Sequence, residues 1–134
     1  MPTDAQSSPF RSWNGVERTE FVDGIRIKAI GGEQVCVCHV VYSAGKQVPL
    51  HVHEHTEQVM VITEGECTVT VEGVAQALGP GDVCVINRGL EHSVYSEHGV
   101  TFYEALAPVP LDHIPDKQRD LVLGPDGGST HVER

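Results

Sequence analysis

Short apolar runs, separated by turns that contain glycine, make up most of the chain. The runs are rich in β-branched or aromatic residues, which favour strands, and they cover 25–30, 34–42, 58–62, 67–71, 83–86, 92–95 and 100–106. No window before residue 110 repeats its apolar positions with the helical period over about ten residues or more. Many short strands with regular turns predict an all-β fold, either a small antiparallel barrel or a sandwich.

The alternation within the runs predicts which strands are covered. In CTVTV (67–71) cysteine and valine alternate with threonine, which is typical of a strand with one buried and one wet face. The run 34–42 is apolar on both faces, so it should be central or covered by another element. Met60 and Ile62 share the parity of Gln58, and we expect all three side chains to point inward.

The two ends of the chain have a different character from its middle. Residues 1–20 are read as an N-terminal arm with two aromatic anchors, Phe10 and Trp13. Residues 21–110 are the β-barrel. The charged segment 111–134 is a C-terminal extension, in which we expect a turn of helix, an edge strand near Leu121–Leu123 and a frayed tail.

Length and composition narrow the class of protein. With 134 residues there is room for one domain. A net charge of −10 argues against binding to nucleic acid or to an anionic membrane. Neither a membrane-spanning apolar run nor a secretory signal is visible, so we expect a cytoplasmic protein whose four cysteines are reduced and mostly buried.

Histidine is concentrated in one short segment, HVHEHTEQ (51–58), which holds three of the eight histidines. If HVH is part of a strand, His51 and His53 point to the same face and offer half of a site for a divalent metal. The remaining ligands must come from elsewhere. Gln58 opens the next strand with an acceptor oxygen, and His92 begins a later strand after the turn NRGLE.

These residues resemble the motifs of the cupin family. Gly45, His51, His53, Gln58 and Gly65 are similar to the first cupin motif, in which a glycine precedes HxH, a Glu or Gln follows, and a glycine closes the hairpin. GPGDVCVINRGLEH (79–92) resembles the second motif, although Asn87 stands where the family usually has proline. The resemblance covers roughly residues 25–107 and implies a small jelly-roll barrel.

The resemblance also implies a metal site. The ligands would be His51, His53, Gln58 and His92, holding one divalent transition ion per chain, Mn, Fe, Ni, Co, Cu or Zn. The family's usual glutamate ligand aligns with Gln58, and the alternative ligand is Glu57, one position earlier. His55 is a candidate fifth ligand or pocket base. The candidate catalytic residues are His55, Glu57 and Tyr103.

Three functions are compatible with this sequence. The first is a metal-dependent enzyme, an isomerase, cyclase or dioxygenase, acting on a small oxygen-rich molecule; cupins with three histidines and a glutamine act in pectin-sugar breakdown and in polyketide cyclisation. The second is a non-catalytic ligand-binding or sensor module, and the third is a cupin whose metal is structural. We also expect a homodimer, because Phe10 and Trp13 on a polar arm are suited to reach a partner's sheet edge.

Overall fold

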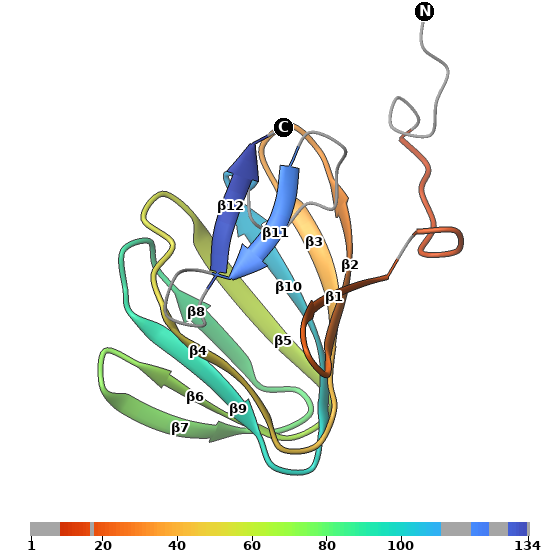
Figure 1. The fold of residues 1–134 in the computed structure, drawn as a ribbon. Coiled ribbons are helices and arrows are strands. Elements are labelled where there is room, and N and C mark those ends of the chain that lie inside the picture. Colours follow the sequence, from red (N-terminus) through yellow and green to blue (C-terminus); the bar gives the residue numbers. More distant parts are fainter. Residues whose placement is uncertain (1–8, 17, 111–118, 124–128, 134) are drawn as a thin grey trace, which may run out of the picture.

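Two antiparallel sheets pack face to face in the computed structural model, which describes residues 9–16, 18–110, 119–123 and 129–133 (Figure 1). The larger sheet has the strand order β1-β2-β3-β10-β5-β8, with bounds Thr19–Val22, Ile25–Gly31, Cys36–Tyr42, Val100–Ala107, Glu57–Gly65 and Val83–Ile86. The smaller has the order β4-β9-β6-β7, with bounds Lys46–His51, His92–Ser96, Cys67–Val71 and Val74–Leu78. This is the jelly-roll arrangement that the sequence predicts.

The core lies between the two sheets, and buried side chains alternate with more exposed ones along its central strands β3 and β10. In β10, Val100, Phe102, Glu104 and Leu106 are buried, and the residues between them are only partly buried. Cys36, Cys38, Met60 and Ile62 are fully buried from neighbouring strands, as their parity predicts. Apolar side chains that leave water in this way supply most of the free energy of folding.

Close approach of the chain to itself fixes one hairpin end. Gly65 ends β5 with a φ of +79°, and a Cβ built on it would collide with the backbone oxygen of Gly99. Only glycine accepts both the left-handed backbone and this contact at low cost.

The predicted strands agree with β2, β3, β5, β6, β8, β9 and β10. Three further strands, β1, β4 and β7, lie in segments that the apolar pattern did not single out, and β1 begins inside the predicted arm. β1 (TEFV) and β4 (KQVPLH) are interrupted by polar residues, and β7 (VAQAL) has only one β-branched residue. Each pairs because a neighbouring strand supplies the backbone partners.

The C-terminal extension differs from the prediction in one respect. Residues 129–133, expected as a frayed tail, form β12 (Ser129–Glu133), which pairs antiparallel with β11 (Arg119–Leu123). Thr130 and Val132, β-branched residues at alternate positions of STHVE, favour this strand. β11 lies against β1. The expected turn of helix at 112–118 lies outside the described residues.

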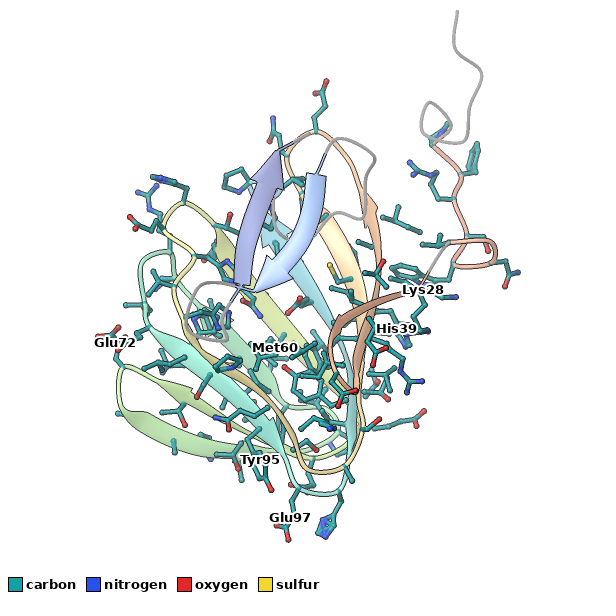
Figure 2. The ribbon with its side chains drawn as sticks, viewed as in Figure 1. Lys28, His39, Met60, Glu72, Tyr95 and Glu97 are labelled. Atoms are coloured by element: carbon teal, nitrogen blue, oxygen red, sulfur yellow. The ribbon has the colours of Figure 1, made fainter. Side chains whose placement is uncertain are left out.

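Trp13 packs on its own chain, on the outer face of the larger sheet. Its ring lies 6.2 Å from that of His39 and 6.1 Å from that of Tyr103, measured between centroids. Lys28 Nζ donates a hydrogen bond of 3.3 Å to the Trp13 carbonyl oxygen. Figure 2 shows Lys28 and His39 on this side of the molecule.

Among the residues described, no helix long and apolar enough to cross a bilayer is found.

Candidate metal centre

The end of β4 and the start of β9 bring two histidines together. His51 and His92 are cross-strand partners, and cross-strand partners have their Cβ atoms close on the same face. The register of the pair shifts between Val48 and His51, in a stretch that contains Pro49, which has no N–H to give to the ladder. This irregularity sets the side to which His51 points.

His53 lies just beyond the end of β4, not within the strand as the sequence reading assumed, yet it is buried at 8% exposure. Its backbone oxygen accepts a hydrogen bond of 2.8 Å from the N–H of Gly89. Gly89 has a φ of +82° in the turn that precedes His92. The turn of the second motif therefore holds the histidine segment of the first motif in place.

Together, the three imidazoles form a compact cluster. Each offers a ligand atom, and these atoms all lie within 4.8 Å of one another. The Nδ1 of His51 donates to the Pro49 oxygen at 2.7 Å, and the Nδ1 of His92 donates to the Leu90 oxygen at 2.9 Å. Because a carbonyl oxygen only accepts, both Nδ1 atoms carry the hydrogen, and in a neutral ring Nε2 is then the atom that can bind a metal. The cluster can hold a metal ion.

The Gln58 side chain lies on the larger sheet and, with His51 and His92, lines one cavity between the two sheets. Its side chain is buried, and its Nε2 donates a hydrogen bond of 2.6 Å to Oε1 of Glu104 on the adjacent strand β10. The Gln58 Oε1 is buried and accepts no hydrogen bond from the described residues. Since an unsatisfied buried acceptor costs roughly 1–3 kcal/mol, this oxygen is suited to a cation.

The cavity between the sheets has a volume of about 30 Å³ and combines the polar groups with apolar walls. It is lined by His51, Gln58, His92, Glu104 and Tyr42 together with Ile25, Ile27, Val40, Val48, Val94 and Phe102. Burial, and then the charge of Glu104, raise the pKa of Tyr42 well above its usual value of 10.0. Tyr42 therefore stays a neutral hydroxyl at any ordinary pH.

The three candidate catalytic residues do not line this cavity. His55 and Glu57 are exposed, and Glu57 points away from the core because it has the opposite parity to Gln58 in β5. Tyr103 lies on the outer face of β10, where its ring is 5.0 Å from that of His39. Of the other histidines, His98 is exposed beside Glu66, and His113 lies outside the described residues.

The sequence reading did not single out Glu104 or Tyr42 as site residues. A signal for Glu104 was present, because in VTFYEAL (100–106) it shares the parity of Phe102 and Leu106. A carboxylate in step with core residues indicates a buried charge with a specific partner. Tyr42 gave no such signal, since a tyrosine at a buried position of a strand is ordinary core.

Comparison with known proteins agrees with this fold. A family model described as a cupin domain matches residues 38–102. An RmlC-like cupin from Shewanella frigidimarina is similar in structure, with a TM-score of 0.71 and 22% identity over 77% of this chain and 93% of that one. KdgF from Halomonas sp. is similar with a TM-score of 0.71 and 21% identity over 78% and 96% of the two chains.

A third structure, a predicted oxalate decarboxylase from Thermotoga maritima, is similar with a TM-score of 0.62 and 19% identity over 73% and 97% of the two chains. At these identities the likeness is one of fold. Among curated proteins, no sequence match was found.

Proposed function

Because the chain contains a small cupin domain, we propose that it is a metal-dependent enzyme that acts on a small, oxygen-rich anion as an isomerase, cyclase or dioxygenase. The observation that carries the proposal is the cluster of His51, His53 and His92. Two of its members, His51 and His92, line one cavity together with Gln58 and Glu104.

In this proposal His51, His53, His92 and Gln58 hold one divalent transition ion. Imidazole nitrogens and an amide oxygen are suitable ligands for Mn, Fe, Co, Ni, Cu and Zn alike. All four ligands are neutral, so the ion keeps its full positive charge. When bound, it would act as a Lewis acid toward carbonyl or carboxylate oxygens, or as a site for O₂.

The surrounding residues orient the ligands and exclude water. The carbonyl oxygens of Pro49 and Leu90 fix two of the imidazole rings through their Nδ1 hydrogens. Glu104 fixes the amide of Gln58, because an ionised carboxylate only accepts hydrogen bonds and so turns the NH₂ end toward itself and the oxygen away. The apolar walls keep the dielectric constant low, which strengthens the electrostatic interactions inside.

Glu104 is also the group we assign to proton transfer. Among the described residues that line the cavity it is the only carboxylate, and one of its two oxygens accepts the bond from Gln58. Its carboxylate is the group that would take a proton from a C–H or O–H made acidic by the ion. Tyr42, held neutral by its raised pKa, would supply a hydroxyl donor to the substrate.

The substrate class follows from charge and size. A site with neutral ligands and a divalent ion favours anionic, chelating molecules, although the chain carries a net charge of −10. A cavity of about 30 Å³ has room for only a few atoms beside the ligands. We therefore propose that only the chelating end of a sugar acid or dicarbonyl compound enters the cavity.

The alternative is a ligand-binding or sensor protein that uses the same pocket without turnover. Such a protein needs the ligand set but not a proton acceptor beside it. The position of Glu104 in the cavity favours the enzyme.

The test is a turnover assay on protein loaded with Mn²⁺, Fe²⁺, Co²⁺, Ni²⁺ or Zn²⁺. Sugar acids and β-dicarbonyl compounds are incubated in D₂O, proton exchange and product formation are followed by NMR, and O₂ uptake is followed with an electrode. We expect exchange or O₂ uptake that is lost in His53→Ala. Saturable binding without exchange, product or O₂ uptake would support the binding protein instead.

A further inference from the structure

One carboxylate on the surface makes a hydrogen bond next to a residue of the histidine cluster. Glu72 lies in the turn between β6 and β7, at the edge of the molecule (Figure 2). Its side chain is exposed, and its Oε2 accepts a hydrogen bond of 2.7 Å from the backbone N–H of Glu91. Glu91 directly precedes His92 in the chain.

The backbone of Glu72 has an unusual conformation at this point. Its φ is +48°, and among the described residues no other residue except glycine has a positive φ. A side chain with a Cβ costs free energy in this left-handed region, and glycine would avoid the cost. A glutamate held there indicates that its side chain makes a specific contact.

The carboxylate takes the place of a backbone oxygen at the end of a strand ladder. β6 and β9 pair antiparallel as far as Val71 and His92, which are cross-strand partners. Beyond them the N–H of Glu72 donates to the backbone oxygen of Glu91 at 2.8 Å. In a regular antiparallel pair the N–H of Glu91 would donate back to the backbone oxygen of Glu72, and here it donates to the carboxylate instead. Glu72 therefore holds both the N–H and the oxygen of Glu91.

The same peptide group also contacts the imidazole of His92. The N–H of Glu91 and the backbone oxygen of Leu90 belong to one peptide unit, and this oxygen accepts the hydrogen bond of 2.9 Å from Nδ1 of His92. Two hydrogen bonds thus connect the Glu72 carboxylate, through one peptide group, with the ring. Hydrogen bonds in such a chain polarise one another, and those to a charged group are the stronger ones.

We propose that Glu72 is a positioning residue for His92, an inference that rests on the proposed function of His92 as a metal ligand. The carboxylate polarises the peptide group, so the Leu90 oxygen becomes a stronger acceptor. That oxygen then holds the Nδ1 hydrogen more firmly, which fixes the orientation of the ring and makes its Nε2 a stronger electron-pair donor to a cation. A carboxylate outside the cavity in this way strengthens a ligand inside it.

His51 provides an internal comparison. Its Nδ1 donates to the Pro49 oxygen at 2.7 Å, as that of His92 does to Leu90. The N–H of the same peptide group belongs to Leu50, and it has no carboxylate partner in the part of the chain that the structure describes. Of these two rings, only that of His92 is connected with a carboxylate through its peptide group. A change at Glu72 should therefore affect His92 and leave His51 unaffected.

Three substitutions separate the hydrogen bond from the backbone strain. Glu72→Ala removes the acceptor and keeps a Cβ in the left-handed conformation. Glu72→Gly removes the acceptor and the strain together, so its apo protein should be more stable than that of Glu72→Ala. Glu72→Gln keeps an acceptor oxygen and loses only the charge.

Calorimetric titration with Zn²⁺ measures the effect on the site. Glu72→Ala and Glu72→Gly should both bind Zn²⁺ roughly 3- to 10-fold more weakly than the wild type, less than for a direct partner of a ligand because a peptide group intervenes. Glu72→Gln should lose affinity by a smaller factor.

Two control variants should keep the affinity of the wild type. Glu54→Gln removes an exposed carboxylate next to His53 in the chain, and so tests the loss of charge near the cluster without the hydrogen bond. Gly73→Ala strains the same turn at a φ of +82° and leaves the Glu72 carboxylate in place.

A measurement without metal tests the two hydrogen bonds themselves. In the apo protein, the ¹H and ¹⁵N chemical shifts of the Glu91 amide and of the His92 Nδ1–H group report on them. Both proton signals should move upfield in Glu72→Ala and Glu72→Gly, because the hydrogen bonds are lost or weakened. They should move less in Glu72→Gln, and the Nδ1–H signal of His51 should stay in place.

Three results would overturn the inference. The first is Zn²⁺ binding by Glu72→Ala and Glu72→Gly that equals that of the wild type. The second is an affinity that follows stability, with Glu72→Gly restored to the wild-type value, since the strain and not the hydrogen bond would then be the cause. The third is a His92 Nδ1–H signal that does not move in either variant. A wild type that binds no metal would remove the proposed function, and the His92 signal alone would then decide whether Glu72 acts on this ring.

Discussion

Gln58 and Glu104 are neighbours on the inner face of the larger sheet, and their hydrogen bond is 2.6 Å long. The amide of a glutamine can present either end to the cavity, and only the oxygen end binds a cation. Glu104 decides between them by accepting from the NH₂ group. Many metal sites use a carboxylate as a ligand. Here the carboxylate of Glu104 instead accepts a hydrogen bond from Gln58, the proposed neutral ligand.

Exchanging the two roles tests this arrangement. In Gln58→Glu, two carboxylates face each other in a buried site, so the apo protein should lose stability. In Glu104→Gln, neither end of the Gln58 amide is favoured, and the metal affinity should fall by roughly 10-fold or more. In the double variant, the donor and acceptor are restored with the roles exchanged, and the affinity should return to the wild-type value or exceed it.

Calorimetric titration of the apo proteins with Zn²⁺ or Mn²⁺ measures these affinities, and thermal unfolding without metal measures the stabilities. An affinity in Glu104→Gln equal to that of the wild type would remove Glu104 from the orientation of Gln58.

For single residues, the alternation of inward and outward side chains along a strand predicts which side chains reach the site. The alternation in β5 predicts that Gln58, Met60 and Ile62 point inward, and all three are buried. Glu57 has the opposite parity and is exposed. The hydrogen-bond partner of Gln58 could not be predicted in the same way, because Glu104 lies on β10, 46 residues further along the chain.

At the scale of the elements, the turn before β9 determines where His53 lies. The N–H of Gly89 reaches the backbone oxygen of His53 only because the turn adopts a left-handed φ of +82°. The sequence indicates a turn here, and the resemblance to cupins indicates that it leads to a ligand. That the same turn also holds His53, which follows β4 in irregular chain, is a tertiary contact that the local pattern does not contain.

Two glycines in the same conformation allow a matched test of this turn. Gly89 and Gly73 both have a φ of +82°, and a Cβ on either would meet no atom within 4 Å. Alanine should therefore cost each variant a similar free energy of unfolding, about 1–2 kcal/mol. Gly73 lies in the β6–β7 turn, whereas Gly89 donates to the His53 oxygen, so only Gly89→Ala should also lower the metal affinity, by several-fold.

Chemical denaturation of the two apo variants and metal titration of each would separate strain from positioning. Equal metal affinity in Gly89→Ala and Gly73→Ala would mean that the bond to His53 does not hold the ligand.

The bulge in β4 marks a limit of sequence-based reasoning at this scale. A regular strand over HVH would put His51 and His53 on one face. The observed strand ends at His51 after a shift of register near Pro49, and His53 follows in irregular chain. The cluster forms as predicted, but turn and bulge produce it, not the simple alternation of a strand.

At the scale of the whole molecule, the sandwich keeps thiols as well as aliphatic groups away from water. Cys67 is fully buried between the sheets, and burial, with a smaller effect of Glu66, raises its pKa from 9.0 to about 11. The folded protein thus requires the neutral thiol. The unfolded chain ionises its thiol near pH 9. The contribution of the neutral Cys67 thiol to stability is therefore fully present below that pH and is lost as the pH rises toward about 11.

Urea denaturation at pH 8 and pH 11 measures this loss. For Cys67 alone it should be at most roughly 2–3 kcal/mol, from two units of pKa at about 1.4 kcal/mol each. Cys67→Ala should be less stable at pH 8 because of the cavity it leaves, but its stability should fall less between the two values. An equal fall in the variant and the wild type would assign the alkaline loss to other groups, such as Tyr42.

The class of fold and the succession of its principal strands along the chain could be predicted from the sequence, because alternation and glycine turns are local features. The order of strands across the sheets, with β10 between β3 and β5, depends on pairings between distant segments and came only with the structure. The three histidines were predicted as a group for the same reason that they are found as one, since two motifs place them at the ends of strands that meet.

The central claim is that the three histidines and Gln58 hold one divalent ion, and metal content per chain tests it most directly. Elemental analysis after mild purification, followed by titration of the apo protein with Mn, Fe, Ni or Zn, should give about one ion per chain for the wild type. His98→Ala, which changes an exposed histidine beside Glu66, should give the same value, and His53→Ala should lose most of the ion. A wild-type protein that carries no ion and binds none of the added metals, or a His53→Ala variant with undiminished content, would contradict the account.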